Sequence, residues 1–252
     1  GAVHIDCLRS LFVNYVKADN FRVALAGQCP TCKQRYNPST QAMIYRSMVD
    51  HLQTQVQAQS PLPLRKNFVG LQLHLGEVLA KEEVQQDAEA KVLLRGVIEN
   101  TVADSMMRAM AKKALAKTYI RAGSLDAAES VLTDCLDVFL TEEARSGLDC
   151  RFAGGTRQTF ALLLEKRGEK QLAVDQHQVV AVKYRQLRGD SDRDTIHAMA
   201  SLSKALLDAG SQQDARDCAL DILDVAKQVL GDGHDLVTKL RQVVKDTAIV
   251  RV

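Results

Sequence analysis

Apolar residues recur at helical spacing through most of the chain. The clearest groups are Leu115 and Tyr119; Val131, Leu132 and Leu136; Leu202 and Leu206; and Leu220 and Leu223. Each group lies on one side of a helix, because residues three or four apart share a helical face. Faces of this kind cannot all be buried inside one pair of helices, so neighbouring pairs must stack. The pattern predicts an all-α chain built from packed helical hairpins.

Glycine and alanine recur in a fixed order within this pattern. Three glycines are each followed five residues later by an alanine, in the pairs Gly123 and Ala128, Gly168 and Ala173, and Gly210 and Ala215. A fourth copy places Glu83 at the glycine position, followed by Ala88, and the alanines then step by 40, 45 and 42 residues. Gly147, Gly189 and Gly231 form a second series with a step of 42. Glycine can end a helix in the left-handed conformation, and alanine lets the next helix approach closely.

The residues of one hairpin resemble a known repeat. The run from Leu115 to Ala128 has the pattern Leu-Ala-x-x-Tyr-x-x-x-Gly-x-x-x-x-Ala, which resembles a tetratricopeptide repeat. The 42-residue step, with a Gly-x-x-His segment at 231–234, is similar to kinesin-light-chain repeats, although Asp235 replaces the usual proline. The resemblance covers about residues 68–245. It implies an all-α, right-handed superhelix of tetratricopeptide-like helical hairpins, an α-solenoid, over 64–252.

The resemblance also implies a binding surface, because the first helix of each hairpin lines the concave groove of such an array. The groove positions are Met110, Lys113, Lys117 and Arg121 in one hairpin, Gln158, Leu162 and Lys166 in the next, and His197, Ser201 and Lys204 in the third. Lys113, Lys117 and Arg121 are spaced four residues apart and form one basic stripe. Such a stripe can pair with the carboxylates of an acidic peptide. The alternative is an ordinary solvated helix face.

Residues 1–36 carry a different pattern. Cys29 and Cys32 flank Pro30 in a Cys-Pro-x-Cys pair, and His4 stands three residues before Cys7. Paired thiolates at this spacing converge about 2.3 Å from a zinc ion. The order resembles the second half of a RING-CH zinc finger, as found in algal and protist repeat proteins. The resemblance implies zinc ligands at His4, Cys7, Cys29 and Cys32, with zinc bound only if further ligands lie upstream.

Three interpretations of this segment stay open: a zinc module completed upstream, a metal-free remnant, or coincidental cysteines in a helical cap. A helix through Met43, Ile44, Met48 and Leu52, followed by a Pro-containing stretch, is expected to connect it to the repeats. The predicted domains are therefore 1–36, a connecting helix and linker at 37–63, and repeats over 64–252.

Composition narrows the class of protein. Of 252 residues, 46% are hydrophobic and 25% are charged, as in ordinary globular proteins. The 33 basic and 31 acidic side chains leave a net charge of +2, without the basic excess of a nucleic-acid-binding protein. No uncharged apolar run is long enough to span a membrane. The six cysteines are too sparse for a secreted disulfide framework, so we expect an intracellular, cytoplasmic protein unless a targeting signal lies upstream.

The sequence offers no convergent catalytic motif. It lacks Gly-x-Ser-x-Gly, P-loop and His-Glu-x-x-His patterns, and we interpret Gly154-Gly155-Thr156 as a short turn before a helix. We expect a non-catalytic interaction scaffold that binds a peptide or a partner subunit in the groove. The alternative is a RING-type ubiquitin ligase that recruits a ubiquitin-conjugating enzyme and selects substrate with its repeats. The apolar ending Ile249 to Val252 predicts docking to another subunit of a larger assembly.

Overall fold

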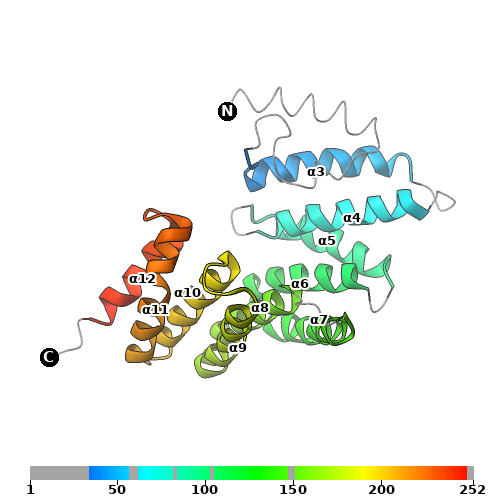
Figure 1. Cartoon of the computed structure of the whole chain (residues 1–252). Helices are drawn as coiled ribbons and strands as arrows, with labels where there is room; N and C mark the ends of the chain where they lie inside the picture. The colour runs from blue at the N-terminus through cyan, green and yellow to red at the C-terminus, as the bar shows by residue number, and fades with distance from the viewer. Residues whose placement is uncertain (1–33, 57–61, 82–83, 103–104, 147–150, 249–252) are drawn as a thin grey trace. The chain divides into compact units, whose positions relative to one another are not determined.

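The computed structural model describes residues 34–56, 62–81, 84–102, 105–146 and 151–248. These residues form ten α-helices (Figure 1). They are α3 (Pro38–Gln53), α4 (Leu62–Leu79), α5 (Asp87–Glu99), α6 (Met106–Arg121), α7 (Leu125–Ser146), α8 (Arg151–Arg167), α9 (Lys170–Arg188), α10 (Arg193–Asp208), α11 (Gln212–Leu230) and α12 (Asp235–Asp246). The predicted all-α class is confirmed.

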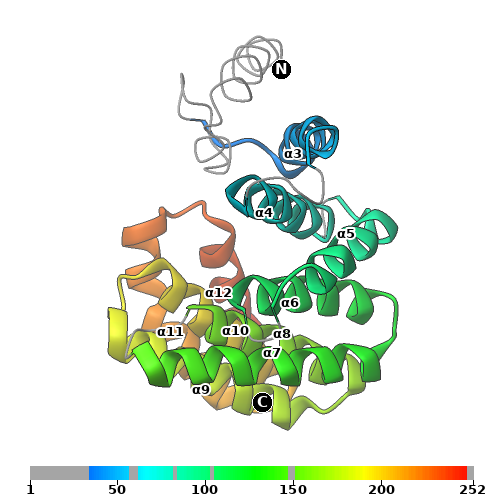
Figure 2. The ribbon, with the colours of Figure 1, turned by 90° about the vertical axis from the view of Figure 1, so that its right-hand side faces the viewer.

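Helices α3 to α6 belong to a first compact unit, which ends at Ser124. Each helix packs on the next, and α4 also contacts α6 directly (Figure 2). Its core holds Ile44, Met48 and Leu52 from α3, Leu71, Leu75 and Leu79 from α4, Leu94 and Val97 from α5, and Leu115 from α6. The helix expected as a connector within 37–63 is thus part of this core, because α4 covers its apolar face.

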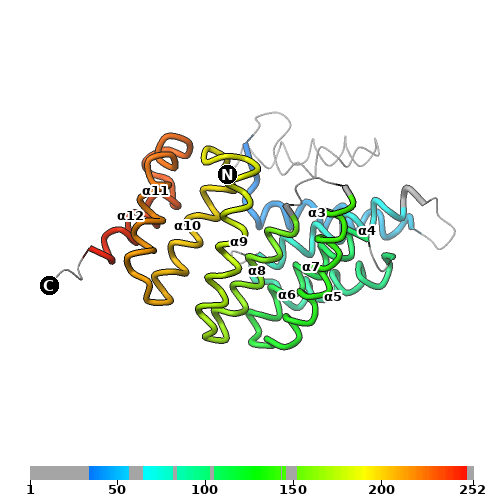
Figure 3. The backbone as a smooth tube through the Cα atoms, turned by 60° about the horizontal axis from the view of Figure 1, so that its bottom comes forward, coloured from blue at the N-terminus to red at the C-terminus, as the bar shows by residue number. Residues whose placement is uncertain are grey.

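Helices α7 to α12 belong to a second unit, which begins at Leu125. Successive helices again pack side by side (Figure 3), and α10 also contacts α12. Fully or nearly fully buried side chains include Leu132 and Phe139 of α7, Leu163 of α8, Val180 of α9, Ile196 of α10, Ile222 of α11 and Leu240 of α12. The contacts of the chain divide between Ser124 and Leu125, inside the expected repeat region 64–252. The domain bounds expected from the sequence stay a prediction.

Three hairpin turns share one hydrogen-bond pattern. Gly123, Gly168 and Gly210 have φ angles of +74°, +81° and +89°. In each turn the glycine N–H donates to the carbonyl three residues earlier, and the next N–H donates to the carbonyl five residues before it. This pattern closes a helix that ends in a left-handed residue, where glycine is favoured. The alanines five residues after each glycine, Ala128, Ala173 and Ala215, are buried as predicted.

The first hairpin follows the same plan in a register that differs from the predicted one. Its left-handed residue is Gln85, with φ +51°, and Ala90, five residues later, is fully buried. Ala88 is exposed, so its expected role was wrong, and Glu83 lies outside the described residues. The physical reason is a longer turn, in which the Gln86 N–H donates to the carbonyl of Leu79, seven residues earlier.

Gln85→Gly is therefore expected to stabilise the first unit, by about 0.5–1 kcal/mol, because glycine removes the steric cost of the left-handed conformation. Urea denaturation followed by circular dichroism measures the change. Gln86→Gly is the matched control, since Gln86 has φ −94° and gains nothing from glycine. Equal effects of the two substitutions would contradict the assigned register.

The loops between hairpins explain the Gly-x-x-His segment. Gly231 is left-handed, the His234 N–H donates to its carbonyl (3.2 Å), and His234 Nδ1 accepts a hydrogen bond from the Leu236 N–H. At the preceding loop Gly189 and Asp192 occupy the same positions, and Asp192 caps α10. The histidine is therefore a helix N-cap. Gly147, the third member of the predicted series, lies outside the described residues.

One further expectation needs correction, whereas docking through the apolar ending at 249–252 stays a prediction. Gly154, Gly155 and Thr156 do not form a turn but lie inside α8, where the absent side chain of Gly154 leaves room for Tyr184 of α9. In α12, Val237, Leu240 and Val243 are buried, because α10 and α11 cover them. The described part of the last helix therefore offers no bare apolar face for docking. Residues 249–252 lie outside the described residues.

Candidate functional site

In the first unit, the expected binding residues lie on the solvent-facing stripe of α6. Met110 and Lys113 are half-buried, whereas Lys117 and Arg121 are exposed. The opposite side of α6 is buried in the core. The four-residue spacing thus places these side chains on one face, as predicted from sequence. Their binding role remains a prediction.

Arg121 is not a free charge on this stripe. Its guanidinium forms an ion pair with Asp87 of α5, and its Nε donates to Asp87 Oδ2 at 3.1 Å. Asp87 lies in the first turn of α5, where a carboxylate also interacts favourably with the helix dipole. The pair ties α6 to α5, so Arg121 contributes to packing of the unit as well as to the stripe.

Lys117 has an unusual electrostatic setting. Burial by surrounding protein atoms lowers the pKa of its ammonium group from 10.5, and the positive charges of Lys113, Arg121 and Lys81 lower the pKa further. Glu77 acts in the opposite direction. The Lys117 side chain is nevertheless exposed.

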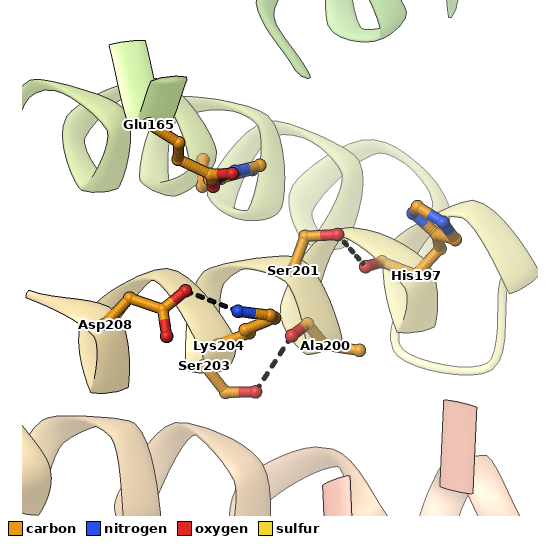
Figure 4. A network of polar contacts seen from close by, with 8 residues as sticks. Glu165, His197, Ala200, Ser201, Ser203, Lys204 and Asp208 are labelled. Atoms are coloured by element: carbon orange, nitrogen blue, oxygen red, sulfur yellow. Dashed lines mark hydrogen bonds and ion pairs between the residues drawn. The ribbon is translucent and has the colours of Figure 1, made fainter. Parts of the chain in front are cut away.

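In the second unit, the expected residues lie on matching stripes of α8 and α10. Gln158 and Ser201 are half-buried, and Leu162, Lys166, His197 and Lys204 are exposed. Leu162 keeps 39% of its surface accessible, an unusual setting for a leucine. On α10, Lys204 pairs with Asp208, and Ser201 Oγ donates to the carbonyl of His197 at 3.0 Å (Figure 4). The two units each hold part of the predicted set.

His197 resembles Lys117 in its surroundings. Burial by nearby protein atoms is the largest influence and lowers the pKa of the imidazole from 6.5. The positive charge of Lys239 on α12, and also His177, lower the pKa further, while Asp194 raises it. The side chain of His197 is exposed. The neutral form of the imidazole is therefore favoured at pH 7.

Sequence reasoning missed a buried histidine beside this stripe. His177 of α9 is 7% exposed, and its Nε2 lies 3.3 Å from Oε1 of Glu165 on α8. Its Nδ1 has no hydrogen-bond partner among the described residues. The signal was available, because Ala173, His177 and Ala181 recur every four residues on the buried side of α9.

The predicted zinc ligands His4, Cys7, Cys29 and Cys32 lie outside the described residues, so zinc binding stays a prediction. Within the described ranges, no group of three or more His, Cys, Asp or Glu side chains is placed to hold a metal ion. Burial raises the pKa of the Cys218 thiol to about 11, which makes it a poor nucleophile at neutral pH. No helix in the described part of the chain is long and apolar enough to cross a membrane.

Comparison with known proteins agrees with this geometry. Residues 195–235 match the family model of the tetratricopeptide repeat. A search of curated proteins gave no match.

Solved structures give broader likenesses. Two crystal structures show the nearly identical TPR-like repeats of a kinesin-light-chain candidate from Podosopora anserina. One is 14% identical with a TM-score of 0.58, covering 90% of this chain and 96% of that chain. The other is 14% identical with a TM-score of 0.56, covering 89% and 96%. BtubC (BKLC) from P. vanneervenii is 15% identical with a TM-score of 0.59, covering 78% of this chain and 75% of that chain. These likenesses confirm a tetratricopeptide-like helical fold of the kind seen in kinesin-light-chain repeats.

Proposed function

We propose that the chain is a non-catalytic interaction scaffold that binds an acidic, extended peptide or partner segment on the solvent-facing stripes of its first helices. One stripe is that of α6 in the first unit. The others are those of α8 and α10 in the second unit. The observation that carries the proposal is that the first helices expose Lys117 on α6, Lys166 on α8 and His197 on α10.

The charges at these positions support an acidic ligand. Burial, and after it the like charge of Lys113, lower the pKa of Lys117, so the protonated ammonium group there is held at an electrostatic cost. A carboxylate placed beside it removes that cost and gains a charge-assisted hydrogen bond. In the second unit Lys166 is exposed next to the accessible Leu162. This combination suits a peptide that alternates acidic and apolar side chains.

The test begins with selection of binders from a display library of random short peptides against the full chain. We expect the selected peptides to be rich in Asp and Glu. Lys166→Glu is expected to weaken their binding about tenfold, the usual effect of losing a charge-assisted contact. Lys170→Glu is the matched control, because Lys170 is equally exposed but begins α9, on the other helix of the same hairpin.

Equal losses from Lys166→Glu and Lys170→Glu would indicate binding by net charge alone and contradict the proposal.

Lys117→Glu tests the first unit in the same way. The variant Lys117→Met should instead raise the stability of that unit while weakening acidic ligands, because it removes both the repulsion and the contact. A merely structural role for Lys117 predicts loss of stability.

Binding of an acidic peptide beside His197 is expected to take up a proton. In the free chain the pKa of His197 is below 6.5, and a nearby carboxylate raises that pKa again. Affinity should therefore increase as the pH falls from 8 toward 6, where the Asp and Glu side chains of the peptide stay ionised. Calorimetry in buffers of different ionisation enthalpy measures the uptake, and His197→Gln should abolish it.

The lowered pKa of His197 makes the stability of the folded chain fall on acidification, whereas the affinity for an acidic peptide rises. His197 has a lower pKa in the folded chain than in the unfolded chain, so the unfolded chain takes up a proton first as the pH falls. The stability that His197 contributes is therefore fully present above pH 6.5 and is lost as the pH falls through the pKa of the folded state. Wild type should therefore lose more stability than His197→Gln on acidification. An affinity that is independent of pH in wild type would contradict peptide binding at this position.

A further inference from the structure

Helix α9 exposes apolar side chains on the side that faces away from the core. Leu172, Val179 and Val182 keep 51%, 45% and 46% of their surface accessible. Their spacing of seven and three residues places them on one helical stripe. A helix that buries its other side, as α9 does with Val180 and Tyr184, is usually polar on its solvent side. The stripe therefore costs solubility without contributing to the core.

Helices α9 and α11 both pack on α10, and α11 is acidic on its exposed side. Arg185 of α9 forms an ion pair with Asp221 of α11 at 2.7 Å. Asp214, Asp217, Asp221 and Asp224 are all exposed, and their spacing places them on one face of α11. The Arg185–Asp221 ion pair thus connects α9, which carries the apolar stripe, to a row of four carboxylates on α11.

Only part of this negative charge is neutralised within the chain. Asp221 pairs with Arg185, and Asp224 pairs with Lys227. No cationic side chain of the described residues lies within ion-pair distance of Asp217, which accepts a hydrogen bond from the amide of Gln213. The same holds for Asp214.

We propose that this face of the second unit binds a basic amphipathic helix. We call it the outer face and define it by Leu172, Val179 and Val182 of α9 and by Asp214, Asp217, Asp221 and Asp224 of α11. The apolar side of the partner helix packs on α9, and its lysines and arginines pair with the carboxylates of α11. Amphipathic helices are in general recognised through their apolar face. The outer face lies on the second helices of the hairpins, so it is a second interaction surface, independent of the first-helix stripes.

Charge distinguishes this partner from other apolar occupants. A second copy of the chain docked face to face would bring two rows of carboxylates together, which is unfavourable. A membrane surface with anionic lipids is repelled for the same reason. A helix with basic residues flanking an apolar stripe complements both features at once.

The probe is a synthetic amphipathic helical peptide with leucines on one side and lysines flanking them. The control peptide has the same composition in shuffled order, which removes the apolar stripe. Fluorescence anisotropy with the full chain at low ionic strength should give an affinity for the amphipathic peptide at least tenfold higher than for the shuffled one. Binding should weaken with added salt, because the carboxylate contacts are screened.

Variants locate the binding site. Val179→Gln combined with Val182→Gln should weaken the amphipathic peptide about tenfold, and Asp214→Asn combined with Asp217→Asn should weaken it and reduce the salt dependence. These side chains are exposed, so circular dichroism should show unchanged folding. Leu162→Gln is the matched control, because Leu162 is an exposed apolar residue on the first helix α8, and it should have no effect.

Three results would overturn the proposal. The shuffled peptide could bind as tightly as the amphipathic one, or the valine variant could bind like wild type. Sedimentation could also show that the chain forms a dimer that Val179→Gln with Val182→Gln dissociates, which would make a second copy the occupant.

Discussion

Gly154→Ala is expected to lower the free energy of unfolding of the second unit by about 3 kcal/mol, at the upper end of the usual cost of overpacking. A Cβ at this position would lie 2.1 Å from the Oη atom and 2.6 Å from the Cζ atom of Tyr184. Tyr184 is 5% exposed, and Arg188 covers its ring at 4.7 Å. The ring therefore cannot move aside, and α8 and α9 must separate.

A double-mutant cycle tests the cause of this loss. Tyr184→Phe removes the nearest atom, so the loss from Gly154→Ala should be smaller in that background. Gly233→Ala in the same unit has open space around the added methyl group and should change stability little. Urea denaturation gives the free energy of unfolding of the four proteins of the cycle and of Gly233→Ala. Similar stability of Gly154→Ala and wild type would contradict the close packing of α8 on α9.

Gly76→Ala is expected to lower the free energy of unfolding of the first unit by about 2 kcal/mol. An added Cβ would lie 2.7 Å from Cδ2 and 2.8 Å from Cγ of Leu94, a fully buried residue of α5. Leu94 is fully buried and has no free space into which another rotamer could move its Cγ atom, so α5 must shift away from α4.

Gly70→Ala provides a control in the same helix. Nothing lies within 4 Å of a Cβ added at Gly70, so this substitution should stabilise α4 by about 0.5–1 kcal/mol through the higher helix propensity of alanine. Opposite signs for Gly76→Ala and Gly70→Ala are the expected result in thermal or urea unfolding. The same sign for both would show that α4 and α5 are not packed as described.

Local pattern accounts for what the sequence predicted well. Helical periodicity and the recurring turn glycines predicted the hairpin turns at Gly123, Gly168 and Gly210. The four-residue spacing predicted that Lys117 shares one helix face with its neighbours in the stripe. Both properties depend on residues within a few turns of one another, so they are visible in sequence.

What the sequence did not predict depends on contacts between distant residues. The sequence led us to place Gly154 in a turn. In the structure the glycine makes room for Tyr184, which is 30 residues away and therefore cannot be recognised from the local pattern. The charge of Arg121 is paired with Asp87, 34 residues earlier. The register of the first hairpin was displaced because Gln85, not glycine, takes the left-handed conformation there. Composition and spacing carry no signal for such partners.

The central claim is that the first helices of the hairpins carry the peptide-binding surface, and the most direct test is an NMR map of backbone amides. The nitrogen-labelled full chain would be titrated with an acidic peptide selected on it. The account predicts chemical-shift changes concentrated in α8 and α10, around Leu162, Lys166 and His197, and in α6 around Lys117. Changes confined to α9 and α11 would contradict it and assign the peptide to the opposite helices of the hairpins.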